Sequence, residues 1–335
     1  AYGRDRNPTW ELLERAVADL EGGAGAVSFA SGMAGVAAVL DLLPLGAEVV
    51  VARDAYSGTR ELLAHLEATG RLRRRVVDAT DPRAPEAARG AAMVWLEALG
   101  NPLLTVPDLP AWKESAGRAG ALLVVDNTLA TPLLCRPLAL GADLVVHSAS
   151  KHLGGHSDLM LGVVAGDDPD LLQRLHAHRT RQGGCPGQLE AWLTLRGMRT
   201  LAVRIERQVA SAAWLAGRLL GSPRISAVHY PGLTGHPQHD RARRQLSGGF
   251  GAMLSIEVDT DAAGAERVCA ATRIWTNATS LGSVESLLER RARWAGEEYL
   301  PAGLIRLSLG IEDREDLLRD LAQALALVGA GPDLG

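Results

Sequence analysis

The sequence predicts an α/β protein, with a mostly parallel, seven-stranded sheet in a large domain and a smaller α+β domain at the C-terminal end. Through the first two-thirds of the chain, short apolar runs alternate with segments of helical period, as in a parallel sheet covered on both faces. After Gly221 the pattern changes to strands separated by single helices. We expect residues 1–205 to form the large domain and residues 206–335 the smaller one.

The first predicted element is a helix over residues 9–20, because its apolar residues share one face and a glycine pair follows. A second helix opens at Ser31 and a third covers 108–119. A long amphipathic stretch over 187–220 predicts a connecting pair of helices. The seven strands of the large domain are predicted over residues 26–30, 48–52, 75–77, 92–97, 121–125, 144–147 and 159–165.

The smaller domain is predicted to contain three strands and three helices, assigned from the same two periodicities. The strands are expected over residues 225–230, 252–258 and 304–309, and the helices over residues 261–272, 284–293 and 313–328.

The composition excludes several classes of function. The formal net charge of −4, without a basic cluster or an acidic tail, argues against nucleic acid and anionic membranes as partners. No apolar stretch has the length of a membrane span, and no signal peptide is recognisable. The three cysteines have no C-x-x-C spacing, which favours reduced thiols and a cytoplasmic protein. Because the chain starts without Met, we expect an N-terminal segment to be missing from it.

Lysine usage singles out one residue. The chain contains only two lysines, Lys113 and Lys151, and otherwise uses arginine for positive charge. Lys113 fits the solvated face of a helix. Lys151 instead lies between a strand end and a glycine pair. A lysine at this position indicates a need for an amine that can lose its proton, which arginine cannot supply.

A phosphate site is predicted where the first strand runs into a helix through Ser31, Gly32 and Met33. Free N–H groups at a helix N-terminus bind phosphate, and Gly32 allows close approach of the backbone. A tight turn alone would also require small residues. The segment is not the dinucleotide fingerprint, because no G-x-G-x-x-G follows the strand, and this argues against an NAD-dependent oxidoreductase.

Two further strand ends carry polar groups that would meet at the same edge of the sheet. Asp126 ends an apolar strand and could either pair with a protonated pyridine nitrogen or cap the next turn. Ser148, Ser150 and Lys151 follow the next strand, where the hydroxyls could donate to phosphate and the amine could react with a carbonyl. Three nearby histidines do not match a zinc spacing, so no metal site is predicted. The order of these groups is what pyridoxal-5′-phosphate (PLP) chemistry requires.

The chain resembles the Cys/Met-metabolism PLP enzymes along nearly its whole length. This family includes cystathionine γ-lyases, cystathionine γ-synthases and homoserine-ester sulfhydrylases, and it implies the type I PLP-dependent transferase fold. The matching segments, in chain order, begin at Tyr2 (YGRDRNPT), Leu20 (LEGG), Ala30 (ASGMA), Val125 (VDNT), His147 (HSASKHLGGHSD), Leu195 (LRGMRTL), Tyr230 (YPGL), His236 (HPQH), Ser280 (SLG) and Ile305 (IRLSLGIE).

The resemblance implies a role for each matched residue. Lys151 would hold PLP as a Schiff base and move the protons of the substrate, while Asp126 would pair with the ring nitrogen. Tyr56 would stack on the ring and help to deprotonate the incoming amine. The phosphate would be held by Ser31, Gly32, Met33, Ser148 and Ser150.

Two further sets of residues concern the partner subunit and the substrate. Tyr2 and Arg4 would reach the phosphate of a neighbouring subunit, which implies shared active sites and a homotetramer built as a dimer of dimers. Arg306 would bind the α-carboxylate of a small amino-acid substrate, with Asn101 and Ser280 beside it.

The reaction is predicted to be γ-elimination on cystathionine, the activity of a PLP-dependent carbon–sulfur lyase. Thr279 stands where cystathionine enzymes usually carry a Glu, and the segment from Glu289 to Trp294 departs from the family pattern. Its arginines would lie on a solvated helix face or contact an anionic end of the substrate. The alternatives are cystathionine γ-synthase, O-acyl-homoserine sulfhydrylase, a specialised-metabolism relative with another γ-substituted substrate, and a non-catalytic regulator with the PLP fold.

Overall fold

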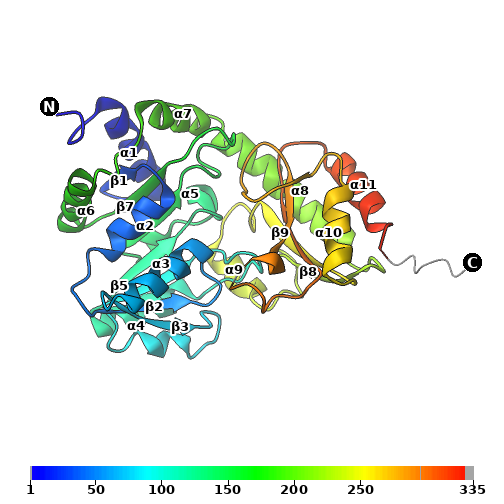
Figure 1. The fold of residues 1–335 in the computed structure, drawn as a ribbon, viewed down its shortest axis with the longest axis horizontal. Coiled ribbons are helices and arrows are strands. Elements are labelled where there is room, and N and C mark those ends of the chain that lie inside the picture. Colours follow the sequence, from blue (N-terminus) through cyan, green and yellow to red (C-terminus); the bar gives the residue numbers. More distant parts are fainter. Residues whose placement is uncertain (1, 295, 329–335) are drawn as a thin grey trace, which may run out of the picture.

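The computed structural model describes residues 2–294 and 296–328, so the last residues of the predicted smaller domain lie outside it. A larger α/β unit and a smaller α+β unit lie side by side, joined by the long helix α8 (Leu201–Leu219) (Figure 1). Each unit has its own hydrophobic core. Val209 of α8 packs on the first core, while Ala212 and Leu215 pack on the second. The division at residue 205 stays a prediction, because α8 runs through it without a break.

The first unit is built on a seven-stranded sheet with the strand order β1-β7-β6-β5-β4-β2-β3. Strand β7 runs antiparallel to both of its neighbours, and the other six strands run in one direction. The predicted fold class and all seven strands are therefore confirmed. The strands are β1 (Gly25–Phe29), β2 (Glu48–Ala52), β3 (Arg73–Val77), β4 (Met93–Glu97), β5 (Leu122–Asp126), β6 (Leu144–Ser148) and β7 (Gly162–Gly166).

Helices pack against the sheet of the first unit. Helix α2 packs against β6 and β7, and α4 packs against β5. Strands β4 and β7 are buried at every residue, and β2, β5 and β6 are buried except at one or both ends, so their near-continuous Val and Leu runs are those of a sheet covered on both faces. The helices of this unit are α1 (Pro8–Glu21), α2 (Gly32–Leu40), α3 (Ser57–Ala68), α4 (Leu109–Ala119), α5 (Thr131–Leu134), α6 (Pro169–Gln182) and α7 (Gln188–Met198).

The second unit has a five-stranded sheet with the order β10-β11-β12-β9-β8. Helices α8, α10 and α11 pack on it, and Leu254, Ile256, Ile305 and Leu307 of the sheet are fully buried beneath them. Its strands are β8 (Ile225–His229), β9 (Met253–Val258), β10 (Thr276–Asn277), β11 (Leu287–Arg290) and β12 (Leu304–Ser308), and its remaining helices are α9 (His239–Gln245), α10 (Ala262–Ala271) and α11 (Arg314–Leu325).

The helix predicted over 284–293 is wrong. This segment forms strand β11, which pairs antiparallel with β12, and then a single 3-10 turn over Arg291–Arg293. The apolar residues of this short segment also fit a helical spacing. As a strand, however, the segment pairs with β12 and buries Leu287 and Leu288. The solvated arginine face expected there is wrong for Arg291, which is buried.

Among the described residues, no helix is both long enough and apolar enough to cross a membrane.

Candidate active site

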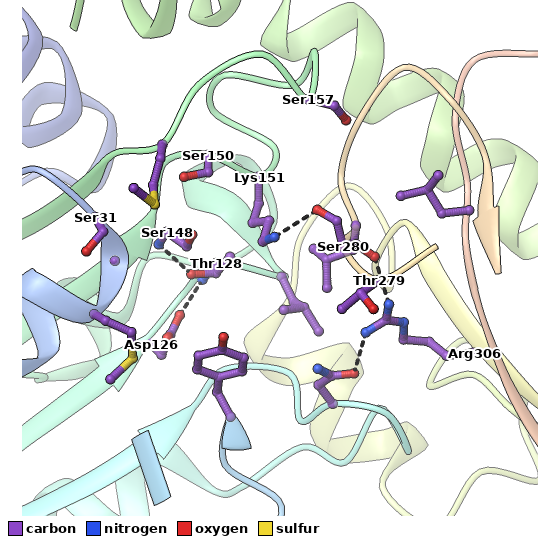
Figure 2. Close-up of a pocket in the computed structure, with 18 of the residues that line it drawn as sticks. Ser31, Asp126, Thr128, Ser148, Ser150, Lys151, Ser157, Thr279, Ser280 and Arg306 are labelled. Carbon is purple, nitrogen blue, oxygen red and sulfur yellow. Dashed lines mark hydrogen bonds between the residues drawn. The ribbon is translucent and has the colours of Figure 1, made fainter. Parts of the chain in front are cut away.

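A cavity of about 760 Å³ lies at the carboxyl ends of the parallel strands, between the two units. Residues that end or follow β4, β5 and β6 form its floor, and residues from the second unit form the opposite wall. Figure 2 shows the labelled side chains converging on it. The cavity brings together ten of the predicted site residues: Ser31, Gly32, Met33, Tyr56, Asn101, Asp126, Ser148, Ser150, Lys151 and Ser280, and an eleventh, Arg306, lies in its far wall.

One end of the cavity is shaped for an anion. Helix α2 starts at Gly32, and Ser31 caps it by accepting a hydrogen bond from the Ala34 N–H at 3.1 Å. The N–H groups of Gly32 and Met33 therefore start a helix and have no intrahelical partner. A Cβ added at Gly32 would lie 3.2 Å from the Ser148 Cβ, a crowded contact, so glycine favours close approach to the backbone here. Free N–H groups and a nearby hydroxyl suit a phosphate.

Asp126 lies on the floor of the cavity, at the end of β5. Its Oδ1 accepts a hydrogen bond from the Thr128 N–H at 2.9 Å, and the Thr128 hydroxyl in turn accepts from the Ser148 N–H at 2.8 Å. Thr128 is thus a residue that the sequence interpretation missed. Two sequence signals point to it: it ends the matched segment VDNT, and it lies two residues after Asp126, whose side chain can accept a hydrogen bond from the backbone N–H at that position.

A second carboxylate lies beside Asp126, because Glu97 is its partner in the β4–β5 register. Burial, together with the charge of Asp126, raises the pKa of Glu97 well above its usual range. Burial also raises the pKa of Asp126, but the hydrogen bonds from Thr128 oppose this rise. Glu97 accepts the Tyr56 N–H at 2.5 Å and so fixes the start of α3. A cation above Asp126 would relieve the cost of burying this charge.

Lys151 lies between the anion end and the opposite wall (Figure 2). Its Nζ donates to the Ser280 hydroxyl at 2.8 Å, so the amine is held at the junction of the two units. Burial, and then the charge of Arg306, lowers the pKa of the Lys151 amine. A lowered pKa increases the neutral fraction of the amine, which is the form that acts as nucleophile and base.

Arg306, on β12, forms the far wall and is only 2% exposed. Its Nη2 donates to the Ser280 carbonyl at 2.7 Å, and its Nη1 is 3.4 Å from Asn101 Oδ1. Its Nε is buried without a hydrogen-bond partner in the described structure. Burial, more than the nearby charge of Arg291, lowers the pKa of Arg306 to about 10, so it stays charged at neutral pH. A buried guanidinium with an open donor can bind a carboxylate.

Tyr2 and Arg4 do not reach this cavity. They lie near the start of the chain, at the far end of the first unit (Figure 1), where the Arg4 Nη1 donates to the Thr180 carbonyl at 3.2 Å. Tyr2 is 64% exposed. Within one chain the structure therefore separates these two residues from the other predicted site residues, and their predicted contact with a neighbouring subunit stays a prediction.

The three histidines near Lys151 share no common partner. His147 contacts Glu21 through Nε2 at 2.5 Å, and His156 contacts the Gly154 carbonyl through Nδ1 at 2.8 Å. His152 is buried, and burial lowers its pKa to about 3. In the parts of the chain that the structure describes, no group of three or more His, Cys, Asp or Glu side chains is arranged to hold a metal ion.

The comparison with known protein families agrees with this geometry. The family model for Cys/Met metabolism PLP-dependent enzymes matches residues 1–326. The chain belongs to this family. It is an enzyme of sulfur amino-acid metabolism, and PLP is its cofactor.

Relatives with three different names resemble the chain at similar levels. A putative cystathionine gamma-lyase of Streptomyces coelicolor is 42% identical over 97% of this chain and 83% of the relative. A cystathionine beta-lyase of Coxiella burnetii is 41% identical over 97% of this chain and 87% of the relative. The crystal structure of a cystathionine gamma synthase from Xanthomonas oryzae pv. oryzae in complex with cystathionine has a TM-score of 0.93, at 40% identity over 97% of this chain and 87% of that one.

The residues of the cavity fit PLP. Asp126 offers a half-buried carboxylate for the ring nitrogen, the start of α2 offers N–H groups for the phosphate, and Lys151 offers an amine of lowered pKa between them. When bound, PLP supplies an electron sink that stabilises negative charge on the carbon atoms of the substrate. Relatives with different reaction names share this architecture, so the reaction depends on the substrate end of the cavity.

Proposed function

We propose that this enzyme is a cystathionine γ-lyase, which converts L-cystathionine and water into L-cysteine, 2-oxobutyrate and ammonia. The observation that carries the proposal is the placement of a single amine, Lys151, between the cofactor-binding floor and the guanidinium of Arg306. In this position one group can take a proton from Cα and then from Cβ of a bound amino acid. A putative cystathionine gamma-lyase is among the relatives that resemble the chain over 97% of its length, at a level similar to the differently named ones, so the substrate panel below decides between their reactions.

In this proposal the chain's residues have the following roles. Asp126 keeps the ring nitrogen protonated, and Tyr56 stacks on the ring and assists deprotonation of the substrate amine. Ser31, Gly32, Met33, Ser148 and Ser150 hold the phosphate. Arg306 binds the substrate α-carboxylate, while Asn101 and Ser280 orient the Arg306 and Lys151 side chains through the contacts described above.

Thr279 stands where cystathionine enzymes usually carry a Glu, so another carboxylate would have to supply the negative charge for the distal ammonium of cystathionine. The Thr279 hydroxyl donates to Glu289 at 2.8 Å. Glu285, which is exposed, lines the cavity beside Ser157, whose hydroxyl lies 3.4 Å from its carboxylate. We propose that Glu285 pairs with the distal ammonium of cystathionine.

The assembly and location of the enzyme are also proposals. We propose a cytoplasmic homotetramer, a dimer of dimers in which Tyr2 and Arg4 of one subunit complete the phosphate site of the next. The exposure of Tyr2, and the fact that neither residue lines the chain's own cavity, support this arrangement.

A substrate panel tests the proposed reaction. The purified holoenzyme is incubated with L-cystathionine, L-homocysteine, L-methionine and O-succinyl-L-homoserine, each with and without L-cysteine. We expect 2-oxobutyrate and cysteine to form from cystathionine without any added thiol. A thioether that accumulates from O-succinylhomoserine plus cysteine, with no 2-oxobutyrate from cystathionine, would show a γ-synthase instead.

A further inference from the structure

A buried ionic cluster lies directly behind the carboxylate-binding end of the cavity. Glu289, Arg291 and Glu297 form it together with Arg306. The side chains of all four are at most 6% exposed. Arg291 belongs to the segment that departs from the family pattern, and the proposed function gives it no role.

The two oxygens of Glu289 have different partners. Oε1 accepts hydrogen bonds from the Thr279 hydroxyl, Arg293 Nη2 and Trp294 Nε1, each at 2.8 Å. Oε2 is shared by two guanidinium groups, with Arg291 Nη1 at 2.7 Å and Arg306 Nη2 at 3.2 Å. Of the two guanidinium groups, Arg306 therefore makes the longer contact with Glu289, and it contacts only the Oε2 oxygen.

Glu297 fixes the orientation of Arg291. The Arg291 Nε donates to one Glu297 oxygen at 2.9 Å, and Nη2 donates to the other at 2.5 Å. This bidentate geometry is rigid because both groups are planar. It leaves Nη1 of Arg291 directed at Glu289.

The charges of the cluster explain why this orientation matters. Two carboxylates and two guanidinium groups balance formally within the buried set, and Arg293, whose side chain is 32% exposed, adds one positive charge. Without Arg291, the strongest remaining buried partner of Glu289 Oε2 would be Arg306. A bidentate Glu289–Arg306 pair would then use the donors that an incoming carboxylate needs.

We propose that Arg291 is a positioning residue that occupies Glu289 and thereby keeps Arg306 available to the substrate α-carboxylate. Arg306 lines the cavity, and its buried Nε has no hydrogen-bond partner in the described structure, so the donors of this guanidinium are not all used by the protein. The inference rests on the proposed role of Arg306 and is independent of which elimination or replacement reaction follows.

The test measures binding of two ligands to the holoenzyme by calorimetry. L-Norvaline has an α-carboxylate and no leaving group, and n-butylamine is the same molecule without the carboxylate. We expect R291A to weaken L-norvaline binding about tenfold or more, the effect of disturbing one hydrogen bond between charged groups, with little change for n-butylamine. The double variant R291A/E289Q should recover most of this affinity, because the competing negative charge is gone.

Two variants complete the design. R290A is the matched control, because the neighbouring Arg290 pairs with Glu266 at 2.8 Å and does not line the cavity. E297Q loosens the orientation of Arg291 while keeping both arginines, and it should show the same selective loss even if R291A fails to fold. The proposal would be overturned if R291A weakened the binding of both ligands equally. It would also be overturned if R291A/E289Q bound L-norvaline no more tightly than R291A does. If R306A leaves the ratio of the L-norvaline and n-butylamine affinities unchanged, Arg306 does not bind the α-carboxylate. In that case the proposed role on which this inference rests is wrong.

Discussion

Replacing Lys151 with alanine is expected to lower kcat by about 10³-fold or more, because the amine is proposed to act both as attachment point and as general base. No other described lysine lines the cavity. The measurement is 2-oxobutyrate formation from cystathionine, combined with the visible absorption spectrum of the protein incubated with PLP.

The Lys113→Ala variant is the matched control for this experiment. Lys113 is the only other lysine of the chain, and it forms a partly exposed pair with Asp143 at 2.9 Å on the outside of the first unit. Its removal should leave both turnover and spectrum unchanged. Turnover of Lys151→Ala within tenfold of the wild type would contradict the assignment.

Replacing Arg306 with alanine is expected to lower kcat/KM for cystathionine by about 10²-fold or more, the usual loss when one partner of a buried charge pair is removed. The guanidinium is 2% exposed and charged at neutral pH, so a substrate carboxylate there would be bound away from water. Because the lost contact is one that binds the substrate, the fall in kcat/KM should appear mainly as an increase in KM.

The Arg306→Lys variant distinguishes charge from geometry. Lysine keeps the positive charge but cannot make the bidentate contact, so its kcat/KM should lie between those of the wild type and Arg306→Ala. Thermal unfolding of all three proteins checks that the fold is intact. A KM for cystathionine that is unchanged in Arg306→Ala would place the α-carboxylate elsewhere.

Much of the first unit could be predicted from the sequence because its signals are local. The apolar runs of the parallel strands are nearly continuous, and the carboxyl ends of such strands meet at one edge, so Asp126, Ser148 and Lys151 could be placed together without a structure. The structure brings these three residues to one cavity, as predicted. The family resemblance added Tyr56, Asn101 and Arg306, whose immediate sequence contains no such signal.

The second unit was harder to predict, because its polar contacts join residues distant in sequence. Glu289 and Arg291 looked like a helix surface, but pairing of β11 with β12 buries them beside Arg306. The buried position of Glu289 depends on contacts from Thr279 and Trp294, which no periodicity reveals. Glu97 and Asp126 become neighbours through strand register, which a single sequence does not specify.

The central claim is that Lys151 carries the cofactor, and the two-lysine composition of the chain allows a direct test. The holoenzyme is treated with borohydride, digested, and mapped by mass spectrometry for a peptide with a reduced pyridoxyl group. We predict a single modified peptide that contains Lys151, with Lys113 unmodified. A modification on Lys113, or no covalent modification in a protein that still catalyses the reaction, would contradict the account.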